Sequence, residues 1–130
     1  MNHFRVANLD QDELLLAWPL VRASEPMLEL EGWRLRGEML IERGGGVIAA
    51  RSADGTIHGV ATYEIVERLV FGSILHVATM VTFDLTRHDY ARRALTACLH
   101  RVCRSLGCAA TVISEMNRPV LRIKPGSTGN

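Results

Sequence analysis

The stretch that decides the fold is residues 74–107, ILHVATMVTFDLTRHDYARRALTACLHRVCRSLG. It predicts a strand that is apolar on both faces, a short polar connector and an amphipathic helix. The N-terminus of a helix attracts anions, because its first N–H groups lack partners inside the helix and its dipole is positive there. Arg87, Arg92 and Arg93 add to this field, although the connector has no glycine that would let a pyrophosphate approach the backbone. The stretch therefore predicts a place for phosphate.

The helix of this stretch is the clearest element, because its apolar residues recur at spacings of three and four. These residues are Ala91, Ala94, Leu95, Cys98, Leu99, Val102 and Leu106. Gly107 then has the position of a typical C′ residue. The apolar run CAATVIS that follows is expected to form a strand parallel to the one beginning at Ile74, through a right-handed crossover.

The N-terminal part predicts a short strand and a helix. The alternation in HFRVA indicates a strand at residues 3–7. Asp10 and Glu13 have the spacing of a capping box, which predicts that a helix begins near Gln11. Pro26 should end that helix.

The middle of the chain predicts a second helix and then antiparallel strands. The helix is expected over residues 28–44, and the glycines at 44–46 should break it. The apolar runs VIAARSA and TIHGVATYEIV follow, joined by Asp54 and Gly55, which predicts a hairpin with a type I′ turn. A second hairpin is expected through residues 67–73. The element order is therefore β-α-α-β-β-β-α-β, a mixed α/β (α+β) sheet.

Composition limits the classes of function. The chain has 130 residues, with 15 basic and 14 acidic side chains and a net charge of +1. This near-neutral balance gives no general attraction to nucleic acid or to an anionic membrane, so neither is expected as a partner. We expect one domain over residues 1–116 and a partly ordered tail over residues 117–130.

Cysteine usage and the absence of a long apolar run favour a cytoplasmic protein. Cys98, Cys103 and Cys108 are odd in number and form no C-x-x-C pair, which indicates reduced thiols rather than disulfides or a metal site. The N-terminal region is acidic where a signal peptide would be apolar. No uncharged apolar run is long enough to span a bilayer.

This order of elements resembles the GNAT superfamily of acyl-CoA-dependent N-acetyltransferases. The phrases GTIHGVATYEI, LHVATMVT and RRALTACLHRVCRSLGCAATVIS are similar to the family's third strand, its fourth strand, and its crossover helix with the fifth strand. The resemblance extends to about residue 124. It implies that acetyl-CoA binds in the split between the fourth and fifth strands.

The resemblance also implies a set of cofactor contacts. In the family, backbone groups near the end of the fourth strand bond the pantetheine arm, and a loop of pattern R/Q-x-x-G-x-G/A binds the pyrophosphate. Arg87 matches the first position of that loop, whereas Tyr90 and Arg92 replace its two small residues. Arginine side chains could bind the phosphates in place of the backbone; a solvated basic helix start is the alternative. The implied contacts are Met80, Val81, Thr82, Arg87, His88, Tyr90, Ala91, Arg92, Arg93 and Asn117.

Acetyl transfer to an amine also needs a base that accepts the ammonium proton. Many relatives have a carboxylate on the fourth strand, where this chain has Ala78 and Thr79. Glu64 and His76 are the nearest substitutes and our candidate catalytic residues, since an imidazole can act as a base near neutral pH. A structural histidine and a solvated strand carboxylate are the alternatives.

The C-terminal region departs from the family pattern. Asn117 loosely matches an asparagine that follows the fifth strand, but Lys124 stands where the family has a thiolate-facing tyrosine. The last helix and the closing strands are expected to be short or missing. Because exposed sheet edges are usually covered, we expect a homodimer or another partner at this edge.

Two functions follow from the resemblance. The first is an acetyltransferase that moves an acetyl group from acetyl-CoA to the amine of an unidentified small molecule or peptide. The second is a catalytically degenerate module of the same fold, used for CoA sensing or protein interaction. The altered loop favours the second, and the frequency of enzymes on this fold favours the first.

Overall fold

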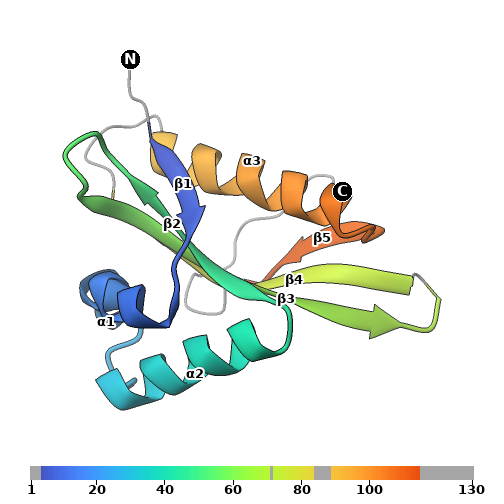
Figure 1. Cartoon of the computed structure of the whole chain (residues 1–130), viewed down its shortest axis with the longest axis horizontal. Helices are drawn as coiled ribbons and strands as arrows, with labels where there is room; N and C mark the ends of the chain where they lie inside the picture. The colour runs from blue at the N-terminus through green and yellow to red at the C-terminus, as the bar shows by residue number, and fades with distance from the viewer. Residues whose placement is uncertain (1–3, 71, 84–88, 115–130) are drawn as a thin grey trace.

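The computed structural model describes residues 4–70, 72–83 and 89–114. The elements follow the predicted order β-α-α-β-β-β-α-β, with the first helical segment divided into a 3-10 helix and an α-helix (Figure 1). Their bounds are β1 (Arg5–Asn8), η1 (Gln11–Ala17), α1 (Trp18–Ser24), α2 (Leu30–Glu42), β2 (Gly46–Arg51), β3 (Ile57–Arg68), β4 (Gly72–Thr82), α3 (Tyr90–Ser105) and β5 (Ala110–Ile113). The predicted α+β class is confirmed.

The described strands form one mixed sheet in the order β1-β2-β3-β4-β5. Neighbours from β1 to β4 are antiparallel, and β5 is parallel to β4, as predicted. Figure 1 shows α3 on one face of the sheet and α1 with α2 on the other. Within the described residues β5 pairs with β4 alone, so β5 is the edge of this sheet. None of the helices described is long and apolar enough to cross a membrane.

A separate group of buried side chains fills each face. The face under α3 includes Ile48, Ala61, Leu75, Val77, Met80, Leu95 and Leu99. The face under α1 and α2 includes Leu14, Ala17, Val21, Trp33, Val47, Ala49 and Val60. The central strands therefore carry apolar residues on both faces, which explains the continuous apolar runs in their sequence.

The apolar residues predicted to lie on one face of α3 are buried at the centre of the helix, but not at its end. Ala91, Leu95, Leu99 and Cys103 are buried, but Leu106 is 50% exposed because it follows the last helical residue. The other apolar residues of this set, Ala94, Cys98 and Val102, are half-buried.

Gly107 ends α3 as predicted. It has a φ of 74°, a region that glycine adopts without a steric penalty. The Cys108 N–H donates to the Cys103 carbonyl at 2.9 Å, and the Gly107 N–H donates to the Arg104 carbonyl at 3.2 Å. These two bonds form a Schellman motif, which turns the chain from α3 into β5.

The capping box is also confirmed. The Glu13 N–H donates to the Asp10 carboxylate, and the Asp10 N–H donates to the Glu13 carboxylate, each at 3.1 Å. The chain begins there as a 3-10 helix and becomes α-helical only at Trp18. The helix ends at Ser24, two residues before Pro26.

The hairpin between β2 and β3 forms, but its turn is not the predicted type I′. Gly55 has a φ of 89°, whereas among the described non-glycine residues only Asp89 has a positive φ, so Asp54 does not meet the type I′ requirement. The Asp54 carboxylate instead accepts bonds from the Ser52 hydroxyl at 2.6 Å and the Thr56 N–H at 3.0 Å. The Ser52 bond and then the Thr56 bonds lower the pKa of Asp54 to about 2. These side-chain bonds favour a turn that the Asp-Gly pair alone does not specify.

Candidate active site

A β-bulge in β4 determines the geometry of the candidate site. Tyr63 of β3 opposes two residues of β4, Val77 and Ala78, so one residue of β4 is extra. The alternation of side chains shifts at this point. Leu75 and Val77 face the core under α3, and so does Met80, three residues further on.

The parallel pairing of β4 with β5 ends beside this bulge. The register joins β4 to β5 from Ile74↔Ala110 to Val77↔Ile113. The Ser114 N–H then donates to the Val77 carbonyl at 2.8 Å. Among the described residues, this is the last backbone bond between the two segments, while β4 continues to Thr82.

The part of β4 beyond the bulge has backbone donors on its β5 side. The Thr79 N–H donates to the Thr62 hydroxyl at 3.2 Å, and the Phe83 N–H donates to a β3 carbonyl at 2.8 Å. Both groups therefore point toward β3. Backbone groups alternate along a strand, so the N–H groups of Met80 and Thr82 point to the opposite edge, beyond the β4–β5 ladder.

A cavity of about 480 Å³ lies on the other face of the sheet, between α2 and strands β3 and β4. Its lining residues are Glu25, Arg36, Leu40, Thr62, Tyr63, Glu64, His76, Ala78 and Thr79. The wall thus contains the bulged part of β4, the facing part of β3 and one side of α2. The two predicted catalytic residues, Glu64 and His76, both lie on it.

Glu64 and His76 face each other across the β3–β4 ladder. They are register partners, and the His76 Nδ1 lies 3.7 Å from the Glu64 Oε2. The side chains are 26% exposed for His76 and 33% exposed for Glu64. The structure therefore brings together the two residues that the sequence analysis selected separately, in a position open to a ligand.

Ser114 is a third member of this group. Its Oγ lies 3.2 Å from the His76 Nε2, so both ring nitrogens of His76 face a polar partner. The sequence analysis missed Ser114, which is separated from His76 by 38 positions. In the sequence, only its position could have pointed to Ser114. It directly follows the apolar run CAATVI, which was expected to form a strand parallel to the one that contains His76.

Arg36 and Glu25 form an ion pair on the cavity wall that the sequence analysis also missed. Two guanidinium nitrogens of Arg36 lie 3.0 and 3.2 Å from the two Glu25 oxygens. Bidentate pairs of this kind hold both side chains in one geometry. The pair neutralises Glu25, which leaves Glu64 as the carboxylate of the wall that has no arginine partner among the described residues.

The predicted cofactor contacts divide into three groups. Met80 and Val81 are buried and Thr82 is half-buried, so their backbone rather than their side chains is available at the β5 edge. Arg87, His88 and Asn117 lie outside the described residues. The remaining contacts, Tyr90, Ala91, Arg92 and Arg93, form the first turn of α3.

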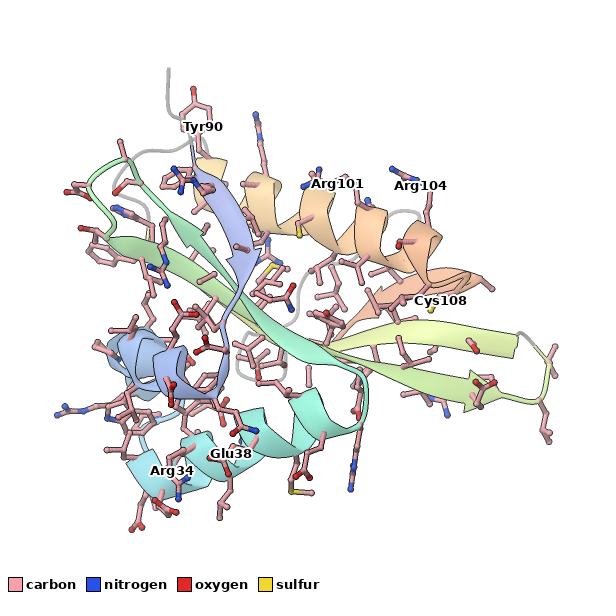
Figure 2. All side chains as sticks on the ribbon, viewed as in Figure 1. Arg34, Glu38, Tyr90, Arg101, Arg104 and Cys108 are labelled. Atoms are coloured by element: carbon pink, nitrogen blue, oxygen red, sulfur yellow. The ribbon has the colours of Figure 1, made fainter. Side chains whose placement is uncertain are left out.

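Asp89 is the N-cap residue of α3. It precedes the helix in the left-handed region, with a φ of 54°, and its carboxylate does not bond the helix. The Arg93 N–H donates to the Asp89 carbonyl at 2.9 Å, which closes the first turn of the helix. Arg93 is exposed, and Figure 2 shows Tyr90 at this end of the helix, with Arg101 and Arg104 further along its outer surface.

No protein-family model and no curated protein sequence matches this chain. Solved structures do match. The aminoglycoside N-acetyltransferase AAC(6')-Iy, solved with CoA, has a TM-score of 0.75 and 16% identity, with 95% of each chain covered. An acetyltransferase of Trypanosoma brucei has a TM-score of 0.70 and 18% identity, with 94% of this chain and 97% of that chain covered. This chain has the GNAT fold.

The GNAT fold extends over nearly the whole length of these neighbours. Glucosamine-6-phosphate N-acetyltransferase from Arabidopsis thaliana gives a TM-score of 0.71 and 14% identity, over 94% of this chain and 97% of that chain. The fold-level resemblance seen in the sequence is therefore confirmed.

Proposed function

We propose that this protein transfers an acetyl group from acetyl-CoA to an amine. The observation that carries the proposal is the bulge of β4 beside the end of β5. Glu64 and His76 line the cavity next to this bulge, on the α2 face of the sheet. The three structural neighbours described above are acetyltransferases with the same fold, and one of them was solved with CoA, which supports the choice of cofactor.

In this proposal, acetyl-CoA enters the edge that β4 exposes beyond its pairing with β5. The backbone N–H groups of Met80 and Thr82 point to that edge and bond the carbonyl groups of the thioester and the pantetheine arm. A donor at the thioester carbonyl stabilises the negative charge that develops there during transfer. The pyrophosphate then lies at the N-terminus of α3, where the exposed Arg93 and the positive end of the helix dipole attract it.

The amine enters from the cavity between α2 and the sheet. An amine is protonated in neutral water, so Glu64, whose carboxylate has no arginine partner within the described part of the chain, attracts it. His76 accepts the proton that the amine must lose, and the carboxylate of Glu64 stabilises the resulting imidazolium. The cavity holds a small amine or the end of a peptide.

A second candidate is a CoA-binding module without transfer activity. Tyr90 and Arg92 in the first turn of α3 favour it, because larger residues there occupy space near the phosphate position. The two candidates differ in one respect: only the first consumes acetyl-CoA in the presence of an amine.

The test is to incubate the protein with acetyl-CoA and a panel of aminoglycosides, amino sugars, polyamines and peptides. We expect amine-dependent release of CoA with at least one class, and an acetylated product in the mass spectrum. Because the chain has three free cysteines, CoA is measured by chromatography rather than with a thiol reagent. Saturable binding of acetyl-CoA without product from any amine would support the sensing module instead.

A further inference from the structure

We propose that the ion pair of Glu25 with Arg36 selects the acceptor, which is an amine that carries no carboxylate or phosphate close to its amino group. This inference rests on the proposed function, since it assumes that the amine enters the cavity between α2 and the sheet. Its basis is the balance of charge on the cavity wall. The charged side chains there are two carboxylates, Glu25 and Glu64, and one guanidinium, Arg36, beside the imidazole of His76.

The backbone on both sides holds Glu25 in place. Glu25 is the C-cap residue of α1; its N–H donates to the Val21 carbonyl at 2.9 Å, and its carbonyl accepts from the Leu28 N–H at 3.0 Å. Arg36 belongs to α2, and its two terminal guanidinium nitrogens lie 3.0 and 3.2 Å from the two Glu25 oxygens. The side chains are 29% exposed for Glu25 and 35% exposed for Arg36. The pair is therefore formed at the cavity before any acceptor binds.

Glu25 uses the positive charge that an acidic acceptor would need. Arginine binds carboxylates and phosphates well because two of its N–H groups match two oxygens of the anion. In this cavity that pair of N–H groups already bonds Glu25. An acidic group that enters with the acceptor loses its water, and on the described wall it finds no guanidinium free of a carboxylate. It also meets the negative charge of Glu64.

The same wall favours an ammonium group. The carboxylate of Glu64 is 33% exposed and has no arginine partner in the described ranges, so it attracts a cation. Leu40 and Ala78 add apolar surface to the wall, which suits the uncharged body of an amine. The cavity thus attracts the amino group and rejects an acidic group beside it, and both effects contribute to specificity.

A second arginine–glutamate pair offers a matched control. The Arg34 Nη1 lies 2.6 Å from the Glu38 Oε2, and these side chains are 39% and 28% exposed, close to the values of the cavity pair. Neither residue lines the cavity. Glu38→Gln therefore removes the same charge from a similar pair outside the site.

The test compares acceptors that differ by one acidic group: tyramine with tyrosine, cadaverine with lysine, and glucosamine with glucosamine-6-phosphate. We expect the wild-type kcat/KM to favour the member without the acidic group by at least about tenfold. Glu25→Gln leaves the Arg36 guanidinium without its counter-charge, so this preference should fall by about tenfold, whereas Glu38→Gln should keep it. The intrinsic reactivity of each amine is the same with every variant, so a change in the ratio reports on the cavity.

A double variant separates the effect of charge from an effect on folding. Glu25→Gln combined with Arg36→Met removes both charges of the pair and should restore the wild-type preference, because no uncompensated guanidinium remains. A protein damaged by Glu25→Gln alone would not recover its preference through a second substitution. Near-ultraviolet circular dichroism of each variant checks that the fold is retained.

Two other results distinguish the inference from the proposed function. If the wild-type protein acetylates both members of each pair equally, or if Glu25→Gln leaves the preference unchanged, the inference is wrong and the proposed function stands. If acetyl-CoA is not consumed with any amine, the proposed function is wrong and the inference fails with it.

Discussion

Replacement of His76 by alanine is expected to lower kcat/KM for acetyl transfer by about 100-fold or more, the usual contribution of a general base. In the proposed mechanism the imidazole accepts the proton that the amine loses, and the Glu64 carboxylate lies 3.7 Å from it. The side chain is 26% exposed and does not belong to either buried core group, so its loss should not unfold the protein. The affinity for acetyl-CoA should change by less than about threefold, because the proposed contacts to the cofactor are made by other residues.

The matched control is His58→Ala. His58 is a half-buried histidine on the neighbouring strand, and its Nε2 also lies 3.2 Å from a serine hydroxyl. It does not line the cavity. Steady-state kinetics on both variants should show a large loss for His76→Ala and near wild-type turnover for His58→Ala. Equal rates for the two variants would mean that His76 has only a structural role.

Replacement of Trp33 by alanine is expected to destabilise the protein by about 3–5 kcal/mol, the usual range for removing a large buried aromatic side chain. Trp33 is fully buried in α2, and its indole N–H donates to the Leu14 carbonyl of η1 at 2.8 Å. It therefore connects α2 with η1 on the face of the sheet opposite α3. A loss of this size is a large fraction of the 5–15 kcal/mol that stabilises a typical domain.

Trp33→Phe separates packing from the hydrogen bond. Phenylalanine keeps much of the apolar contact but cannot donate to Leu14, so we expect a smaller loss of about 1–3 kcal/mol. Urea unfolding, followed by circular dichroism, measures both variants. A Trp33→Ala protein within about 1 kcal/mol of wild type would contradict the assignment of Trp33 to the core.

Local patterns in the sequence predicted much of the fold. The capping box of Asp10 and Glu13 and the Schellman end at Gly107 need only a few consecutive residues, and both formed as expected. The apolar spacing of three and four residues in α3 is likewise a pattern within one short segment. The turn at Asp54 was predicted wrongly, because bonds from the Ser52 hydroxyl and the Thr56 N–H determine its geometry, and the Asp-Gly pair does not specify them.

The candidate site was predicted less completely, because its geometry depends on strand pairing. Glu64 and His76 could be selected by residue type, but only the register across β3 and β4 brings them together. The bulge at Val77 and Ala78 has no glycine to mark it in the sequence, and Ser114 reaches His76 only through the parallel pairing of β5. The predicted domain boundary, cytoplasmic location and homodimer remain predictions.

A calorimetric titration of acetyl-CoA into the full chain tests the central claim most directly. We expect saturable binding of about one cofactor per chain, with a Kd in the micromolar range typical of enzyme substrates. Arg93→Ala, at the first turn of α3, should weaken binding by about tenfold through loss of a phosphate contact. Arg104→Ala, an exposed arginine at the other end of the same helix, should bind like wild type. The absence of binding heat at millimolar acetyl-CoA, together with an unchanged melting temperature, would contradict the assignment of the β4–β5 opening as a cofactor site.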